Sequence, residues 1–318
     1  MRPADKVIDV SGAGPQLPPP VVPDPICAHA FLAMQFPPRD LLLAPWLPEK
    51  GLAMIAAPRG LGKTHVALNV AFAVASGGSF LRWRASAARR VLYVDGEMPA
   101  VSLQERLARI VAHSTADLAP DVLAFLAADQ CEFGLPDLST PEGQALLRPR
   151  LDPFDLIVLD NLSTLCRSGR ENEAESWGQV QAFALELRRA NKSVLFVHHT
   201  GKGGAQRGTS KREDVLDSVL LLKRPEDYGA SQGARFIVQF DKARGFTGAD
   251  AEPFEAALDP HTGLWSMTAV SESRDAQIRE LKGIGYSVRE IAEELGVSKS
   301  TVDRVLQRLN GGANGHAV

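Results

Sequence analysis

Short, solidly apolar runs alternate along the chain with longer stretches whose apolar residues recur at helical spacing. The solid runs cover residues 52–56, 91–94, 156–159, 194–197 and 219–222, and the helical stretches cover residues 64–75, 100–112 and 174–190. Because a strand that is apolar at every position is buried on both faces, this alternation predicts a parallel sheet covered by helices on both sides. Residues 234–240 and 254–258 alternate between apolar and polar positions, which predicts antiparallel strands at the sheet edge. The pattern therefore predicts an α/β fold with a mainly parallel sheet.

The two ends of the chain differ in composition from this α/β region. Residues 1–24 are rich in proline, which predicts an extended, mobile arm. Near the other end, a polar stretch precedes a separate all-helical unit. We expect an N-terminal arm over 1–40, an α/β domain over 41–265, a linker over 266–273, a helical domain over 274–310 and a disordered tail over 311–318.

The composition limits the classes of protein that this chain fits. Its 318 residues are 45% hydrophobic and 23% charged, which suits one large globular domain with a small appendage. Three widely spaced cysteines argue against a disulfide framework or a zinc site: Cys27, Cys131 and Cys166. Because no apolar run approaches the ~20 residues of a membrane span and the N-terminus lacks a signal-peptide core, we expect a cytoplasmic protein. With a formal net charge of −3, nucleic-acid binding must come from local basic segments.

Residues 57–64 have the composition of a phosphate-binding loop. They read Ala-Pro-Arg-Gly-Leu-Gly-Lys-Thr and lie between an apolar run and a helical stretch. In such a loop, backbone N–H groups and the helix N-terminus bind phosphate, the lysine places a charge near the β- and γ-phosphates, and the threonine hydroxyl binds Mg²⁺. The first position is alanine where the strict pattern has glycine. The predicted ATP contacts are Ala57, Pro58, Arg59, Gly60, Leu61, Gly62, Lys63 and Thr64.

Asp160 ends the apolar run 156–159. At the carboxyl edge of a parallel sheet, its carboxylate is placed to bind the same Mg²⁺ as Thr64. An aspartate after an apolar run is common in α/β proteins, so the phosphate loop is what makes Asp160 a candidate nucleotide and metal ligand.

Two acids follow the apolar run 91–94. Glu97 lies at the expected tip of this strand, where it is placed to activate the water that attacks the γ-phosphate. Asp95 precedes it by two residues and competes for this role. A further interpretation is that Glu97 only starts a helix ahead of Met98 and Pro99.

Two adjacent histidines, His198 and His199, follow the run 194–197. Neighbouring residues of a strand point to opposite faces, so only one of them faces the nucleotide, which disfavours a two-histidine metal site. A neutral imidazole there is able to sense hydrolysis by hydrogen bonding to phosphate or to the attacking water. The alternative is a purely structural histidine pair.

These segments together resemble the RecA-like hexameric helicase and recombinase ATPases. Gly-Glu-Met-Pro over 96–99 is similar to a segment of DnaB-type replicative helicases, and His-His-Thr-Gly-Lys-Gly over 198–203 is similar to the plasmid RepA helicases. The resemblance covers about residues 40–265. It implies a RecA-type P-loop fold, a hexameric ring, Mg·ATP hydrolysis at subunit interfaces and translocation on single-stranded DNA.

The resemblance also implies a role for each matching residue. Lys63 and Thr64 bind phosphate and metal, and Asp160 supports Mg²⁺. Glu97 activates water, and His199 takes the place of a sensor.

The segment 239–248 gains a role from the same resemblance. Lys242-Ala-Arg244 ahead of Gly245 is similar to a DnaB-type Lys-x-Arg segment that reaches into the nucleotide site of the neighbouring subunit. A cation that arrives in trans stabilises charge on the transferring phosphoryl group. The alternative is a solvated hairpin edge.

A glycine-rich basic loop follows His199. Its cations suit the phosphates of single-stranded DNA, and Arg167 and Arg170 are placed to add to them. No aromatic residue occurs in 200–214, so this loop has no base-stacking contribution. An ordinary charged surface loop is the alternative interpretation. The candidate DNA contacts are Lys202, Arg207, Lys211 and Arg212.

The segment 274–310 resembles a helix-turn-helix of the resolvase or sigma-factor kind. Ser287 and Ser298 are candidate helix N-caps, and Gly296 is expected to end the first of these helices. The small positive charge of the segment leaves a protein-contact module as an alternative to duplex binding. The second helix presents candidate contacts to the major groove, namely Lys299, Thr301, Arg304 and Arg308.

Taken together, these features predict a Mg²⁺-dependent ATPase that acts on DNA. The expectation is a ring-forming replicative helicase of plasmid, phage or mobile-element type, with ATP and Mg²⁺ as cofactors. It binds single strands through the ATPase loops and duplex DNA through the helix-turn-helix. The alternative is a DNA-bound regulatory or recombination-mediator ATPase that does not unwind DNA.

Overall fold

The computed structural model describes residues 22–167, 173–200, 214–225 and 227–311. The chain divides into two compact units, residues 1–38 and residues 39–318. Within the first unit, the expected arm contains a short exposed helix, α1 (Ala28–Ala33). The proline-rich residues 1–21 lie outside the described residues.

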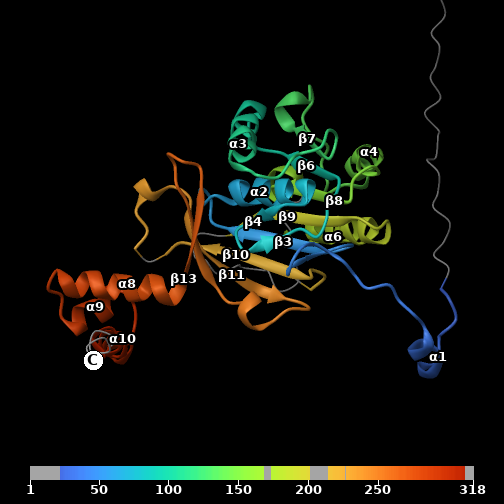
Figure 1. The fold of residues 1–318 in the computed structure, drawn as a ribbon. Helices are drawn as coiled ribbons and strands as arrows, with labels where there is room; N and C mark the ends of the chain where they lie inside the picture. The colour runs from blue at the N-terminus through green and yellow to red at the C-terminus, as the bar shows by residue number, and fades with distance from the viewer. Residues whose placement is uncertain (1–21, 168–172, 201–213, 226, 312–318) are drawn as a thin grey trace, which may run out of the picture. The chain divides into compact units, whose positions relative to one another are not determined.

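One large sheet dominates the second unit. In the part of the chain that the structure describes it has nine strands, in the order β13-β12-β11-β10-β3-β9-β8-β6-β7 (Figure 1). Six adjacent strands run parallel to one another: β10 (Ser218–Lys223), β3 (Leu52–Ala57), β9 (Ser193–His199), β8 (Leu156–Asp160), β6 (Val91–Asp95) and β7 (Leu123–Ala127). The antiparallel strands β11 (Arg235–Ala243), β12 (Phe254–Leu258) and β13 (Trp265–Ala269) extend one edge.

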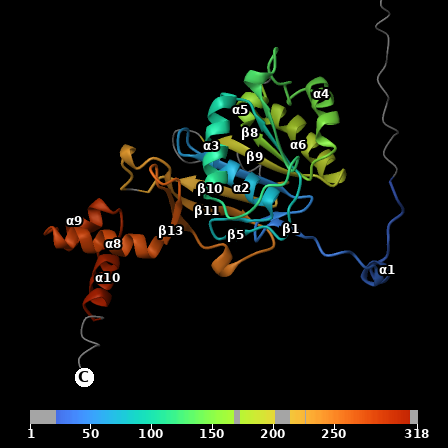
Figure 2. The same ribbon diagram turned by 45° about the horizontal axis from the view of Figure 1, so that its top comes forward.

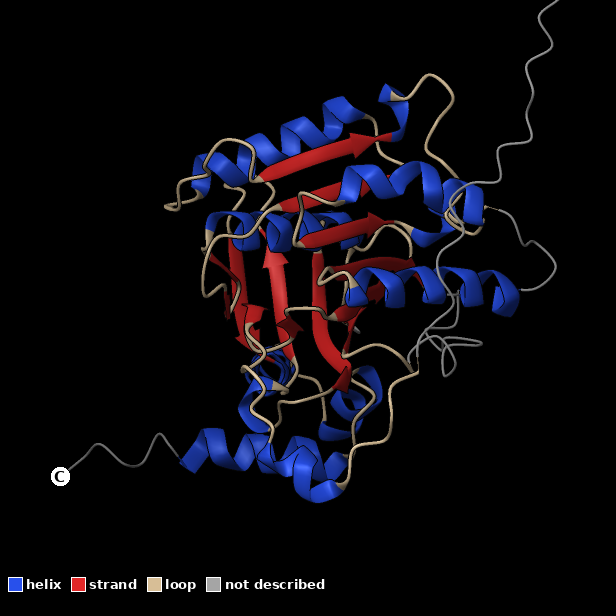
Figure 3. Cartoon of the chain, turned by 90° about the vertical axis from the view of Figure 1, so that its right-hand side faces the viewer, coloured by secondary structure: helices blue, strands red, loops and turns tan. Residues whose placement is uncertain are grey.

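Helices cover both faces of this sheet, as the sequence pattern predicts (Figures 2 and 3). One face buries its apolar residues against α2 (Lys63–Ser76) and α3 (Ala100–His113). The other face packs against α4 (Pro141–Leu151), α5 (Leu162–Leu165) and α6 (Glu173–Arg189). Two small hairpins border the sheet, β1 (Leu41–Leu43) with β2 (Leu47–Pro48), and β4 (Ser79–Phe80) with β5 (Trp83–Arg84).

The strand register brings distant segments to one edge. Ala57 at the end of β3 lies opposite His199 on β9, and Asp95 on β6 lies opposite Asp160 on β8. Because parallel strands end at the same edge, residues from four separate segments meet there. This carboxyl edge is where the phosphate-binding loop begins.

The structure differs from the sequence expectation at the end of the α/β domain. Residues 266–273, expected as a linker, form most of β13 and the first turn of α8 (Val270–Gly283). Among the described residues β13 is the last strand of the sheet and pairs with β12 alone. Residues 266–269 are exposed, so they lack the apolar pattern that predicts a buried strand. The sequence pattern also did not predict strand β7 or helix α4.

The C-terminal helices form a small domain with its own core. Helices α8, α9 (Val288–Glu294) and α10 (Lys299–Gly311) bury a shared apolar cluster of Ile278, Ile291, Ala292, Leu295, Val302 and Val305. Both predicted N-caps are confirmed, because Ser287 Oγ accepts from the N–H of Glu290 and Ser298 Oγ accepts from the N–H of Thr301. No helix of the described residues has the length and apolar character that a membrane span requires.

Candidate active site

The phosphate-binding loop has the backbone shape that its glycines permit. Gly60 and Gly62 have φ angles of +75° and +102°, a region that residues with a Cβ rarely adopt. A Cβ on Gly62 would also lie 3.1 Å from Cβ of Ala234, where the antiparallel hairpin passes close to the loop. Any larger residue at this position would strain the loop. The expected order of a strand over 52–56, the loop and a helix over 64–75 is confirmed by β3 and α2.

The side chain of Lys63 lies along the inside of this loop. It is buried, and its Nζ donates hydrogen bonds to the carbonyl oxygens of Ala57 at 3.0 Å and Pro58 at 2.8 Å. Burial lowers the pKa of Lys63 to about 8, against the opposing effect of the Asp160 and Glu97 charges. An anion bound in the loop would stabilise the charged form of this lysine.

Asp160 is held by hydroxyl groups from two different elements. Tyr93 Oη on β6 donates to Asp160 Oδ2 at 2.7 Å, and the Thr64 hydroxyl at the start of α2 also hydrogen bonds to this carboxylate. Burial nevertheless raises the pKa of Asp160, because the low-dielectric surroundings disfavour its charge. A cation beside Thr64 and Asp160 would relieve this cost.

The two competing acids of the β6 loop have different surroundings. Asp95 is buried, and its Oδ1 accepts the backbone N–H groups of Glu97 at 2.8 Å and Met98 at 2.5 Å. Burial raises the pKa of Asp95 to about 6 despite these hydrogen bonds. The Glu97 side chain, in contrast, is 60% exposed. Asp95 therefore shapes the turn that presents Glu97.

Two polar groups from neighbouring strands orient Glu97. Asn161, which follows β8, donates from Nδ2 to Glu97 Oε2, and His199 Nε2 lies 3.5 Å from the same oxygen. Burial and, secondarily, the charge of Lys63 lower the pKa of His199, so its imidazole is neutral at pH 7. The contact between His199 and Glu97 is then a hydrogen bond from a neutral ring, with the proton on Nε2.

A cavity of about 510 Å³ brings these residues together. The predicted residues Lys63, Thr64, Glu97, Asp160 and His199 line it. Arg106 on α3 and the residues just before β11, Gly233 and Ala234, also line it, and these were not predicted as site residues. His198, the strand neighbour of His199, is not among the lining residues. This agrees with the expectation that only one of the two histidines faces the site.

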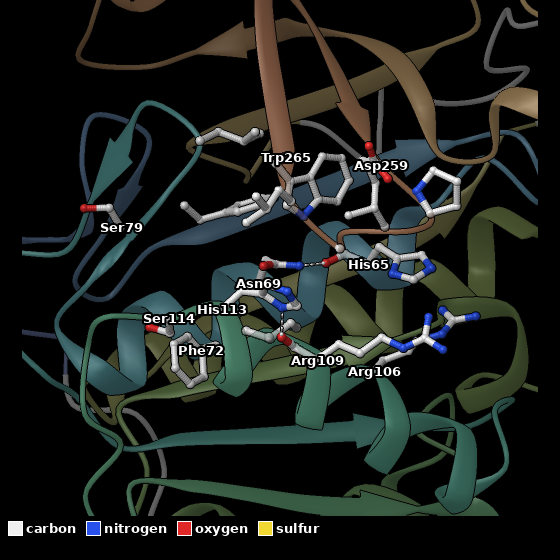
Figure 4. A pocket seen from close by; sticks show the side chains of 17 residues that line it. His65, Asn69, Phe72, Ser79, Arg106, Arg109, His113, Ser114, Asp259 and Trp265 are labelled. Atoms are coloured by element: carbon white, nitrogen blue, oxygen red, sulfur yellow. Dashed lines mark hydrogen bonds between the residues drawn. The ribbon is translucent and has the colours of Figure 1, made fainter.

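A second cavity of about 230 Å³ adjoins the first between α2, α3 and the β12–β13 turn. His65 and Arg106 line both cavities, so the two cavities lie next to each other at these side chains. Figure 4 shows Trp265 on one side of this space and Arg106 and Arg109 on the other. Burial and the charges of the two arginines lower the pKa of His65 to about 4, so its ring is uncharged at neutral pH.

Several residues of the site escaped prediction, among them Tyr93, Arg106 and Asn161. In the sequence pattern, Tyr93 is one residue of the apolar run 91–94, and its spacing does not indicate a contact with Asp160. Arg106 lies on one face of α3 among other charged positions. Asn161 directly follows the predicted ligand Asp160, and this adjacency was the one available signal.

Lys242 and Arg244 lie far from this cavity within the chain. Strand β11 is antiparallel to β10, so its end at Ala243 lies beside Ser218, the first residue of β10, at the edge opposite the phosphate-binding loop. The backbone N–H of Arg244 donates to the Asp217 carbonyl at 2.9 Å, and Lys242 Nζ donates to the Asp214 carbonyl at 3.2 Å. Neither cation lines the cavity of its own chain.

The predicted nucleic-acid contacts are only partly described. Lys202, Arg207, Lys211, Arg212 and Arg170 lie outside the described residues, as does the side chain of Arg308. On α10, Lys299 and Arg304 are exposed, whereas the hydroxyl of Thr301 shares a 2.8 Å hydrogen bond with Ser298 at the helix N-cap.

Two protein families and a curated DNA repair protein match parts of this chain. The AAA domain family matches residues 18–205, and a helix-turn-helix domain family matches residues 276–309. The chain is 27% identical over 189 residues to the DNA repair protein RadA of Campylobacter jejuni, a match that covers 58% of this chain and 36% of that protein. The chain therefore spans about a third of the length of this curated relative.

Three solved structures are similar to part of this chain. The RadB recombinase is 16% identical, with a TM-score of 0.47 over 70% of this chain and 91% of that one. A KaiC-like protein of Pyrococcus horikoshii is 13% identical, with a TM-score of 0.48 over 70% and 90%. The flagellar accessory protein FlaH of Methanocaldococcus jannaschii is 12% identical, with a TM-score of 0.47 over 70% and 91%.

Proposed function

Because the chain belongs to the AAA domain family and is a RecA-like P-loop ATPase with a C-terminal helix-turn-helix domain, we propose that it hydrolyses ATP with Mg²⁺ in order to act on DNA. The observation that carries the proposal is the meeting of five side chains around one cavity. Lys63, Thr64, Asp160, Glu97 and His199 come from segments far apart in the sequence, and each has a chemical role in phosphoryl transfer.

The residues present fit a magnesium ion. The Thr64 hydroxyl and the Asp160 carboxylate already share a hydrogen bond, and both are the hard oxygen ligands that Mg²⁺ prefers. The burial that raises the pKa of Asp160 is compensated when a cation lies beside it. Mg²⁺ at this position would neutralise charge on the β- and γ-phosphates.

Lys63 and the loop backbone bind the phosphates. When Nζ donates to phosphate oxygens in place of the carbonyls of Ala57 and Pro58, the negative charge of the phosphate stabilises the charged form of Lys63, which burial disfavours. The base and sugar extend toward His65 and Arg106, where the second cavity begins.

Glu97 orients the attacking water and accepts its proton. Asn161 and His199 hold the carboxylate, and Asp95 fixes the backbone turn beneath it. Because the neutral imidazole of His199 contacts the carboxylate directly, a change in the γ-phosphate is transmitted from Glu97 to the end of β9. This is the sensor role of His199.

A ring of subunits would complete the site. Arg244 and Lys242 lie at the edge opposite their own phosphate-binding loop, which supports a role for them at the site of a neighbouring subunit. Together with the resemblance of residues 96–99 and 198–203 to replicative helicases, this placement supports our proposal of a hexameric helicase of plasmid, phage or mobile-element type that translocates on single-stranded DNA. Duplex DNA is bound by α10 of the helix-turn-helix.

A second candidate function is a recombination-mediator or regulatory ATPase that binds DNA without unwinding it. The match to a protein named for DNA repair favours this candidate. Both functions use the same ATP site and differ in what hydrolysis accomplishes.

The experiment that tests the proposal measures ATP hydrolysis by the full chain with and without single-stranded DNA, with the Lys63→Ala variant as control. Assembly mass in ATP and displacement of one strand from a forked duplex are measured in parallel. DNA-stimulated hydrolysis with strand displacement supports the helicase. Stimulated hydrolysis without displacement supports the second candidate, and hydrolysis that DNA does not change contradicts both.

A further inference from the structure

An aromatic ring projects into solvent from the loop that follows β7. Of the large apolar side chains that the structure describes, Phe133 has the highest exposed fraction, 90%. It forgoes roughly 1.5–3 kcal/mol of the stabilisation that burial of a phenyl ring provides. A fully exposed ring at a fixed position is a ready contact for a partner.

The turn that carries Phe133 is held by hydrogen bonds. The N–H of Cys131 donates to the Ala128 carbonyl at 3.2 Å, and the N–H of Gly134 donates to the Cys131 carbonyl at 2.8 Å. Gly134 has a φ of +72°, which allows the chain to leave the turn sharply. The ring is therefore presented on a defined backbone.

Further hydrogen bonds join this loop to the segment after β8. The N–H of Leu138 donates to the Leu165 carbonyl at 2.8 Å, and Arg167 Nη2 donates to the Leu135 carbonyl at 2.5 Å. Arg167 Nη1 lies 3.9 Å from the position that a Cβ on Gly134 would take. The guanidinium thus lies beside the residue that follows Phe133.

The charge around the ring is balanced. Arg167 is exposed, and within the described residues its guanidinium has a carbonyl partner and no ion pair. Glu132 precedes the ring and is also exposed, so the turn has no excess of positive charge. A nucleic acid bound here is held mainly by its bases, with one phosphate at Arg167.

The turn lies at the same sheet edge as the ATP site. Ala127, the last residue of β7, lies opposite Asp95 on β6, which precedes Glu97. A nucleic-acid strand that contacts this edge can therefore lie near both the turn and the segment that carries Glu97.

We propose that Phe133 is a stacking platform for an unpaired base of single-stranded nucleic acid and that Arg167 binds the adjacent phosphate. The inference rests on the proposed action on DNA and names a base contact for it. A phenyl ring stacks on any base because every base has a π-face, so the contact is tolerant of sequence.

The test compares binding of two labelled strands of equal length by the full chain, one of oligo-dT and one of abasic sugar-phosphate. Phe133→Ala is expected to weaken oligo-dT binding roughly tenfold and to leave abasic binding unchanged, because only the first strand has bases. Phe133→Trp is expected to retain oligo-dT binding. Leu146→Ala, which removes another apolar side chain that is 73% exposed, is the matched control and is expected to bind like the wild type.

The salt dependence separates the two residues. Phe133→Ala leaves the slope of log affinity against log salt unchanged, whereas Arg167→Gln lowers it by about one unit. The inference would be overturned if Phe133→Ala bound oligo-dT with wild-type affinity or lost equal affinity for the abasic strand. A fall in the assembly mass of Phe133→Ala would also overturn it, because the ring would then be a contact between proteins. If the wild-type chain bound neither strand, the proposed action on DNA would fail as well. If the wild-type chain bound oligo-dT and Phe133→Ala bound it equally well, only the stacking role would fail.

Discussion

The hydroxyl of Tyr93 donates a hydrogen bond to Oδ2 of Asp160 over 2.7 Å, between two buried side chains on neighbouring strands. Burial, reinforced by the charge of Asp160, raises the pKa of Tyr93 well above 10, so the phenol keeps its proton and remains a donor. One oxygen of the predicted metal ligand is thereby fixed by β6, while the Thr64 hydroxyl approaches from α2. Tyr93 is not among the residues that line the cavity, so it acts on the site through Asp160.

Tyr93→Phe is expected to lower the free energy of unfolding by roughly 1–3 kcal/mol, because Asp160 keeps its buried charge and loses a donor. The half-saturating Mg²⁺ concentration for ATP hydrolysis is expected to rise, since the carboxylate is no longer held in position. Urea denaturation and a Mg²⁺ titration measure the two effects. Tyr286→Phe makes the same chemical change in the C-terminal domain and serves as control. An unchanged Mg²⁺ requirement would remove the positioning role.

Lys63→Ala and Glu97→Gln are expected to separate binding from turnover. The first removes the phosphate-binding charge and abolishes hydrolysis together with tight nucleotide binding. The second keeps the shape and the contacts of Glu97 but removes its basicity, so ATP still binds while kcat falls roughly 10²- to 10⁴-fold. Nucleotide binding and steady-state hydrolysis are measured on both variants. Normal turnover in Glu97→Gln would exclude it as the base and return attention to Asp95.

Mixing Arg244→Ala subunits with Lys63→Ala subunits is expected to restore part of the ATPase activity. Arg244 lies at the edge opposite its own phosphate-binding loop, so a mixed interface can join an intact loop to an intact arginine. Each variant alone is the control, and mass measurement in ATP establishes that mixed assemblies form. Absence of recovery in such assemblies would argue against action in trans.

Asp217→Asn is expected to lower the free energy of unfolding at pH 7 by about 2 kcal/mol, because it removes the charged partner of Arg39 and Arg188. Burial alone would raise the pKa of Asp217, but the hydrogen bonds from Arg39 and Leu52 and the charge of Arg188 lower it overall. The carboxylate therefore stabilises the fold above its unfolded pKa of about 3.9, and this contribution is lost as the pH falls through the lower folded pKa.

The difference between wild type and Asp217→Asn should thus be full at pH 7 and should shrink below about pH 4. Urea denaturation over this pH range measures it. Glu293→Gln, in an exposed ion pair with Arg289, is the control and is expected to change little. A pH-independent difference would mean that Asp217 acts through packing alone.

Arg304→Ala is expected to weaken duplex binding by roughly fivefold or more, because Arg304 is exposed on α10. Single-strand-stimulated hydrolysis should be unaffected. Fluorescence anisotropy with a labelled duplex at fixed salt measures the loss, and Arg289→Ala on α9 makes an equal charge change in the same domain. If Arg304→Ala left the affinity for duplex DNA unchanged, the C-terminal domain would be identified as a protein-contact module.

The sequence by itself determined the features that depend on neighbours in the chain. The phosphate-binding loop follows from contiguous residues, Ala57 to Thr64, whose glycines permit the required backbone. The buried strands follow from unbroken apolar runs, and the caps at Ser287 and Ser298 follow from hydrogen bonds that span three residues. Each of these signals is local, so no knowledge of the fold was needed.

Only the tertiary structure decided how those pieces meet. Tyr93 and Asp160 are 67 residues apart, and they touch because β6 and β8 are adjacent in a strand order that no local pattern encodes. The same order brings both Asp95 and Glu97 to the cavity and places Arg244 at the opposite edge of the sheet. The strand β13 escaped prediction for a related reason: an edge strand is stabilised by backbone hydrogen bonds to its partner and leaves its polar side chains exposed.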